Sequence, residues 1–103
     1  MEPSYAVLVT RGRRTGRPHA VRLRVVVYEG SMYFSRHRPD GDWFKNALAD
    51  PSVEVRYDGR TIRGRASVAD SRVSRIVSEL KYPGEGRARE RRVAIRVMPE
   101  PLS

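Results

Sequence analysis

The residues that first suggest chemistry form a short basic segment near the start of the chain, Arg11-Gly12-Arg13-Arg14-Thr15-Gly16-Arg17-Pro18. A guanidinium group donates hydrogen bonds in a planar fork that matches the oxygens of phosphate and carboxylate. Glycine lets the backbone approach a ligand closely, and Thr15 adds a hydroxyl. We interpret the segment as an anion-binding turn. The alternative is a solvated turn, because all but two of the 21 basic residues in this chain are arginine.

Two neighbouring aromatic residues, Trp43 and Phe44, form the second candidate for chemistry. They are expected to open a helix just after a basic stretch that contains glycine. An indole there can wall a flat ring system while the amides at the helix N-terminus face an anion. The alternative is that both rings pack in the core, which is the more frequent role of such residues.

Other kinds of site lack their usual residues. The chain has no cysteine, so disulfides and thiolate chemistry are excluded, and with His19 and His37 as its two histidines no metal site is expected. A Gly-x-Ser-x-Gly nucleophile motif is also absent. Redox chemistry would therefore have to come from a bound cofactor.

Size and charge limit the class of protein. With 103 residues, the chain is expected to form a single domain over 1–103. A net charge of +9 attracts polyanions, which suits both nucleic acid and an anionic cofactor. The apolar runs are about four residues long and the start has no basic segment, so neither a membrane-spanning helix nor a secretion signal is expected. The expected compartment is the cytoplasm.

Apolar residues alternate with polar ones along much of the chain, which predicts strands. Glu29-Gly30 and Asp58-Gly59 are typical hairpin turns. The expected strands cover 5–10, 20–28, 31–35, 53–57, 61–68 and 93–98.

Two short helices complete the expected structure. The first follows Asp42 as N-cap and stops before Pro51. The second follows Asp70 as N-cap, and its core face is expected to carry Val73, Ile76, Val77 and Leu80. The sequence thus predicts a mainly β protein with two short helices, built as a six-stranded antiparallel barrel.

Three segments of the chain carry a family resemblance when they are taken in order: 9–18, the strand end at Ser35-Arg36, and 42–51 followed by Val53. Together they resemble the deazaflavin-dependent nitroreductase family, one of the flavin-reductase-like split β-barrels, which are related in fold to pyridoxamine 5'-phosphate oxidase. The later Tyr82-Pro83 and the strand that ends at Pro99 also fit this family. The resemblance implies a homodimeric split β-barrel that binds coenzyme F420, a deazaflavin with a phosphodiester and an oligoglutamate tail, or FMN in related branches.

The resemblance also implies positions for the cofactor. The family's turn that holds the phosphate end falls on Arg13, Arg14, Thr15 and Gly16. Ser35 and Arg36 fall on a strand end that meets the cofactor, and Trp43 falls near the deazaflavin ring. His19, which stands where the family tends to have arginine, and Phe44 complete the cofactor-binding candidates.

The implied reaction is hydride transfer from the reduced cofactor to a small acceptor such as a quinone, an enone or a nitro compound. Tyr82 is the candidate on the substrate side. The tyrosines that follow this position in nitro-reducing members are replaced here by 84–92, so nitroreduction is the least supported reaction.

Two alternatives remain from the sequence. A basic β-barrel that binds nucleic acid would stack bases on Tyr33, Phe34 or Trp43 and pair arginine with phosphates. A barrel that binds a flavin without turnover would use the same cofactor residues. Titration with cofactors and with an oligonucleotide separates these alternatives.

Overall fold

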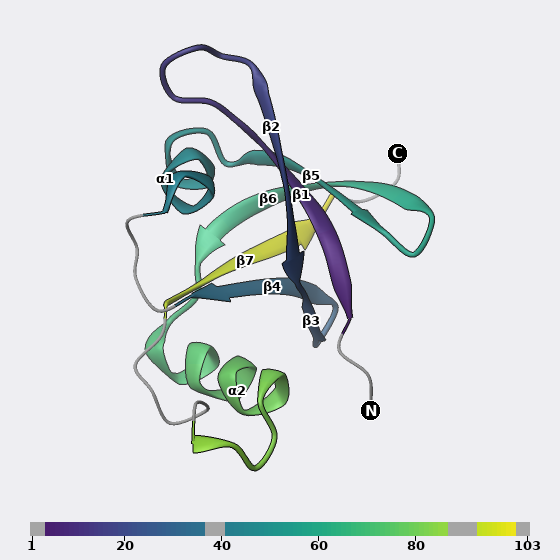
Figure 1. Ribbon diagram of the computed structural model, residues 1–103, viewed down its shortest axis with the longest axis vertical. Helices are drawn as coiled ribbons and strands as arrows, with labels where there is room; N and C mark the ends of the chain where they lie inside the picture. Colours follow the sequence, from purple (N-terminus) through teal and green to yellow (C-terminus); the bar gives the residue numbers. More distant parts are fainter. Residues whose placement is uncertain (1–3, 37–40, 87–92, 101–103) are drawn as a thin grey trace.

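The computed structural model describes residues 4–36, 41–86 and 93–100. Its elements, drawn in Figure 1, are β1 (Tyr5–Arg11), β2 (Pro18–Arg24), β3 (Val26–Tyr28), β4 (Ser31–Arg36), α1 (Asp42–Ala49), β5 (Ser52–Tyr57), β6 (Arg60–Val68), α2 (Ser71–Lys81) and β7 (Val93–Pro99). The loop expected over 37–40 and the charged connection expected over 87–92 lie outside the described residues. The mainly β class with two short helices is confirmed.

All seven strands belong to one curled sheet in the order β2-β1-β5-β6-β7-β4-β3, and every pair in it is antiparallel. The two edges, β2 and β3, are consecutive in the chain. The curl therefore brings the edges near each other, and the sheet forms a half-barrel (Figure 1). The predicted fold is confirmed, except that the described residues form seven strands and not six.

The additional strand comes from a break at Val25 in the segment expected to be one strand over 20–28. β2 ends at Arg24 and β3 begins at Val26. Between them, the amide of Val25 donates to the carbonyl oxygen of Ser4 over 3.0 Å, and the Val25 side chain is buried. At this point the chain passes from one edge of the sheet, β2, to the other edge, β3. The alternation of apolar residues continues across the break, so the sequence pattern does not reveal it.

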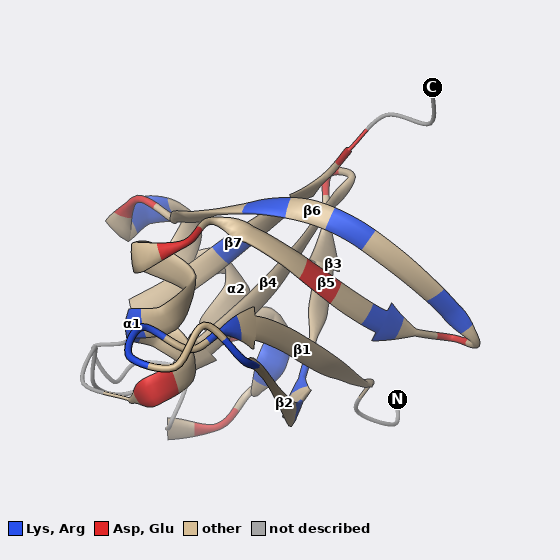
Figure 2. Cartoon of the chain, turned by 90° about the horizontal axis from the view of Figure 1, so that it is seen from above, with Lys and Arg blue, Asp and Glu red and all other residues tan. Residues whose placement is uncertain are grey.

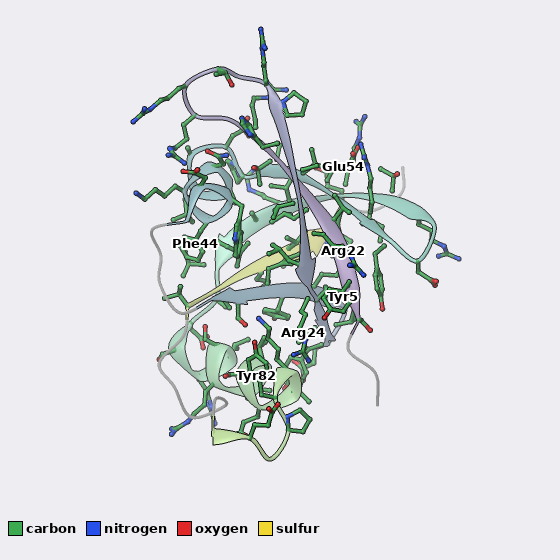
Figure 3. All side chains as sticks on the ribbon, viewed as in Figure 1. Tyr5, Arg22, Arg24, Phe44, Glu54 and Tyr82 are labelled. Atoms are coloured by element: carbon green, nitrogen blue, oxygen red, sulfur yellow. The ribbon has the colours of Figure 1, made fainter. Side chains whose placement is uncertain are left out.

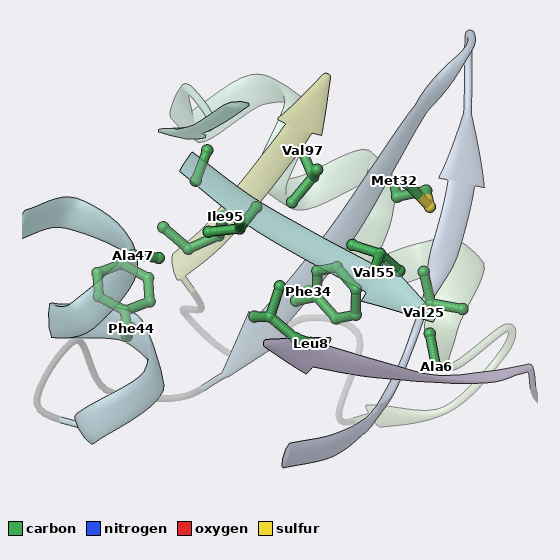
Figure 4. Packing of buried hydrophobic residues seen from close by; sticks show 12 residues of the cluster. Ala6, Leu8, Val25, Met32, Phe34, Phe44, Ala47, Val55, Ile95 and Val97 are labelled. Carbon is green, nitrogen blue, oxygen red and sulfur yellow. The ribbon is translucent and has the colours of Figure 1, made fainter. Parts of the chain in front are cut away.

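The core fills the inside of the curl. Figure 4 shows its side chains converging from β1, β4, β5, β7 and α1. Its buried members are Ala6, Leu8, Val25, Met32, Phe34, Phe44, Ala47, Val53, Val55, Ala66, Ile95 and Val97. Removing this much apolar surface from water is the main stabilising contribution to the fold.

Both expected hairpin turns are present. Glu29 and Gly30 have φ values of 48° and 79°, and Asp58 and Gly59 have 52° and 72°. Consecutive residues with positive φ are what a two-residue hairpin turn between twisted strands requires. The two turns connect β3 to β4 and β5 to β6.

Helix α1 packs against β1 and β6, and α2 packs against β3, β4 and β7. The N-cap expected at Asp42 is wrong: Gly41 is the N-cap, and Asp42 is the first helical residue. The N-cap at Asp70 is confirmed, because its side chain accepts a hydrogen bond from the amide of Val73 over 2.8 Å. In the described ranges, neither helix is long and apolar enough to cross a bilayer.

The prediction that Leu80 of α2 lies in the core is wrong. Leu80 is 50 % exposed, whereas Val77 is fully buried. The buried face of the helix consists of Ser74, Val77 and Ser78, so Leu80 falls outside it near the end of the helix. The apolar spacing identified the helix but did not identify how far its contact with the sheet extends.

Candidate functional site

The basic segment forms the tip of the hairpin between β1 and β2, which projects beyond the sheet (Figure 1). The amide of Gly12 donates to the carbonyl oxygen of Arg17 over 2.8 Å, and that of Gly16 donates back to Gly12 over 3.0 Å. Gly16 has a φ of 69°, which favours glycine. The hydroxyl of Thr15 accepts from the amide of Arg17 over 3.2 Å. We call residues 12–17 the β1–β2 loop; its own hydrogen bonds give it a defined shape.

Gly12 is buried at the base of this loop. A Cβ atom placed there would lie 2.7 Å from Nε2 of His19 and 2.9 Å from the hydroxyl oxygen of Thr15, both closer than real Cβ contacts. Glycine is therefore needed for these two polar side chains to approach the backbone of the loop. The close approach at Gly12 is thus made by side chains of the chain itself, and the approach of a ligand to the loop backbone stays a prediction.

The loop and helix α1 form the walls of a pocket of about 300 Å³ that is open to solvent. Figure 2 shows the blue segments of the loop beside the start of α1. The residues lining it are Gly12, Arg13, Arg14, Thr15, His19, Asp42 and Asn46. Four of the residues expected to bind the cofactor, Arg13, Arg14, Thr15 and His19, are thus brought together here, while Gly16 sets the turn beside them.

Arg13 is held by helix α1. Its Nη1 atom donates to Oδ1 of Asn46 over 2.7 Å and to the carbonyl oxygen of Asp42 over 3.2 Å, and its backbone amide donates to the same Oδ1 over 3.3 Å. Its Nη2 atom lies 3.6 Å from a carboxylate oxygen of Asp42. This arginine therefore joins the loop to the helix.

Arg14 and Arg17 differ from Arg13. Within the part of the chain that the structure describes, their side chains make no hydrogen bond or ion pair, and both are exposed. Arg11, just before the loop, pairs with Asp50 at 3.7 Å. Both fork-shaped donors are thus unpaired, and Arg14 lines the pocket, where it is available to an anion from outside.

The two aromatic residues have separate roles in α1. Phe44 is 2 % exposed and belongs to the core, which is the alternative that the sequence left open. Trp43 is half-buried, and its ring meets that of Phe44 edge-on with centroids 5.8 Å apart. Trp43 thus lies on the helix that borders the pocket, without lining it.

The other candidates lie around α2. Lys81 donates through Nζ to the carbonyl oxygen of Ser35 over 3.1 Å and to its hydroxyl over 3.3 Å. Arg36 ends β4 opposite Val93. Tyr82 is buried, and the guanidinium of Arg24 lies 4.9 Å from its ring centre; Figure 3 shows these two side chains near each other. None of these residues lines the pocket at the β1–β2 loop.

Asp42 and Asn46 line the pocket although sequence reasoning selected neither as a site residue, and of the two only Asn46 is buried. Its side chain is 4 % exposed and carries both contacts to Arg13 described above. A polar side chain on the apolar face of a predicted helix was the available signal, since a buried amide needs hydrogen-bond partners. Its partner, 33 residues earlier, is not identifiable from spacing.

Comparison with known proteins decides the family. The family described as F420H(2)-dependent quinone reductase matches residues 1–99. The chain belongs to this family. Its members are oxidoreductases that use F420, so the expected function and cofactor are confirmed, and F420 is favoured over FMN. A search of curated proteins found no match.

Solved structures agree with the F420H(2)-dependent quinone reductase fold. An F420-H2-dependent reductase, FDR-A, is 17 % identical with a TM-score of 0.74, over 91 % of this chain and 93 % of its own. A second structure, an F420 reductase, is 20 % identical with a TM-score of 0.67, over 99 % and 90 %. A third, described as a domain-swapped dimer, is 16 % identical with a TM-score of 0.74, over 94 % and 81 %.

Proposed function

We propose that this chain transfers a hydride from reduced F420 to a quinone and holds the anionic part of the cofactor at the β1–β2 loop. The observation that carries the proposal is Arg14, whose guanidinium group has no partner in the described residues and which lines a pocket of about 300 Å³. The family assignment supplies the cofactor and the acceptor class.

The residues at the pocket fit a phosphodiester. A phosphate oxygen accepts hydrogen bonds and carries charge, and arginine provides both a fork of donors and a positive charge. Gly12 has no side chain, so His19 and Thr15 can pack against the backbone of the loop at the pocket. The loop therefore offers a positive charge and polar side chains at the same place.

When bound, the reduced deazaflavin supplies a hydride, and with one proton the quinone becomes a hydroquinone. The chain's own contribution is to bind and orient. Arg14 anchors the charged end, and Trp43, on the adjoining helix, provides an apolar face for the ring. No acid-base triad is required for hydride transfer, which agrees with the lack of such a motif in the sequence.

The nucleic-acid alternative has lost part of its support. Of the three proposed stacking residues, Tyr33 is 4 % exposed and Phe34 is fully buried, so their ring faces are unavailable to bases. Trp43 is the remaining one, and a single ring gives a poor platform for a strand.

The proposed function is tested by titrating the purified chain with F420, FMN and a single-stranded oligonucleotide. We expect saturable fluorescence changes with F420, weaker binding of FMN, and oxidation of the bound reduced cofactor when a quinone is added. Binding of the oligonucleotide that weakens steeply with salt, with no F420 signal, would support the alternative instead. Binding of F420 without turnover by any quinone would leave a storage or sensing role.

We also propose that the chain is a homodimer. Support comes from the structural neighbour described as a domain-swapped dimer and from aliphatic side chains that are about half exposed, Val27, Leu48, Val68, Leu80 and Met98. Light scattering is expected to give twice the mass of one chain; the mass of a single chain at micromolar concentration would contradict the proposal.

The remaining assignments stay predictions: one cofactor-binding domain over 1–103, a cytoplasmic location, and cofactor or substrate contacts at Ser35, Arg36, Phe44 and Tyr82. Crosslinking of a photoreactive F420 analogue followed by peptide mapping would test the contacts. Cell fractionation would test the location.

A further inference from the structure

The side chain of Asn46 occupies the junction between the β1–β2 loop and helix α1. Its Oδ1 atom accepts two hydrogen bonds from Arg13, one from the backbone amide over 3.3 Å and one from Nη1 over 2.7 Å. Its Nδ2 atom donates to the hydroxyl oxygen of Thr10 over 3.4 Å. Asn46 is 4 % exposed and Thr10 is 1 % exposed, so water does not replace these bonds.

The chemistry of the partners determines which way the carboxamide points. Both groups that Arg13 presents are donors, so the atom facing them must be the carbonyl oxygen of the amide. The amino group is then directed to Thr10, whose hydroxyl can accept. The two sides of the amide therefore support a single orientation, and Arg13 is held at its backbone and its side chain together.

This arrangement leaves one edge of the Arg13 guanidinium less satisfied than the other. Nη1 donates to Asn46 and to the carbonyl oxygen of Asp42. Nη2 has a carboxylate oxygen of Asp42 at 3.6 Å, beyond hydrogen-bond length, and that carboxylate is 94 % exposed. The Nη2 edge can therefore donate to an anion that enters the pocket.

We propose that Asn46 is a positioning residue for the anion pocket: it fixes Arg13 so that Nη2 is offered to the phosphodiester of F420. The inference rests on the proposed function. Asn46 acts through Arg13, and the pocket would receive two guanidinium groups: that of Arg13, held in place by the helix, and that of Arg14, free to adjust to the ligand.

The test compares Asn46→Ala and Asn46→Asp in the full chain. Alanine removes the acceptor of Arg13, whereas aspartate keeps an oxygen there, loses the donor to Thr10 and adds a negative charge. We expect Asn46→Ala to weaken F420 binding by about tenfold in a fluorescence titration, and Asn46→Asp to weaken it less, by about twofold to fivefold, because Arg13 stays held while the added charge repels the phosphodiester. Amide hydrogen exchange in 11–17 without cofactor is expected to be faster in Asn46→Ala.

A second ligand separates positioning from general damage to the fold. A deazaflavin riboside that lacks the phosphodiester has no group for Nη2, so its affinity should be the same in Asn46→Ala and in the unchanged protein. Equal losses for both ligands, or unchanged F420 affinity in Asn46→Ala, would overturn the inference. If Asn46→Ala does not fold, Arg13→Lys replaces it: lysine keeps the charge without the fork, and an unchanged F420 affinity would again overturn it.

Arg14→Ala distinguishes this failure from failure of the proposed function. If Arg14→Ala weakens F420 binding and Asn46→Ala does not, the positioning role is wrong and the pocket assignment stands. If neither variant changes F420 affinity, the pocket does not hold the cofactor and both proposals fail.

Discussion

The same residue type has two different roles in two regions of this molecule. At the β1–β2 loop, Arg14 and Arg17 extend from a tight turn without partners in the described residues. At the end of α2, Arg24 donates to the carbonyl oxygen of Lys81 over 2.6 Å and lies over the ring of Tyr82 (Figure 3). The first region has charge available for a ligand, and in the second the charge supports the fold.

This difference shows why net charge is a weak guide to function. A charge of +9 attracts any polyanion, but only cations without internal partners can bind one with new hydrogen bonds. The partner of each guanidinium distinguishes the two cases, and it becomes visible only in the folded chain.

The largest effects are expected from two single variants, in each of which alanine replaces an arginine of one region. Arg14→Ala should weaken F420 binding on the order of tenfold to a hundredfold, because charge-assisted hydrogen bonds to the ligand are lost, while the melting temperature stays unchanged. Arg24→Ala should leave F420 affinity unchanged and lower the free energy of unfolding by about 1–3 kcal/mol, because a hydrogen bond to a backbone carbonyl oxygen and a cation–π contact are lost.

Fluorescence titration and thermal melts of both variants provide the measurement, and each variant is the control of the other. The comparison breaks down if Arg24→Ala weakens F420 binding as much as Arg14→Ala does. In that case Tyr82 and its surroundings would belong to the cofactor site after all.

A smaller effect of opposite sign is expected at Asp42. Its exposed carboxylate lies 3.6 Å from Nη2 of Arg13 and bears the same sign of charge as the cofactor's phosphodiester. Asp42→Asn should therefore strengthen F420 binding by about twofold to fivefold at low salt, with the gain shrinking as salt is added. Isothermal titration at two salt concentrations measures it; weaker binding by the variant would show that the carboxylate aids the site.

Glycine shows a similar contrast between the site and the core. A Cβ atom on Gly12 would meet two pocket side chains, whereas one on Gly64 of β6 would lie 2.5 Å from Cγ1 of Val97 and 2.9 Å from the carbonyl oxygen of Met98. Gly64 thus allows two strands to approach closely. The sequence does not reveal this role of Gly64, because its neighbours on β7 cannot be identified from the sequence of β6.

Much of the secondary structure of this protein is predictable from short stretches of its sequence. Alternating apolar residues identified the strands, Glu29-Gly30 and Asp58-Gly59 identified two hairpins, and Asp70 identified a helix start. These signals are readable because each depends on the preferences of neighbouring residues. The basic turn and the order of the motifs after it indicated the deazaflavin-dependent family, and the family comparison agrees.

Only the tertiary structure decided which residues act together. One predicted strand is divided where the amide of Val25 donates to the carbonyl oxygen of Ser4, the position of α2 leaves Leu80 exposed, and Asn46 meets Arg13 from 33 residues away. Each of these outcomes depends on how the sheet curls and where a helix packs on it. The partners in such long-range contacts cannot be identified from the sequence of either element alone, because they depend on how the elements pack.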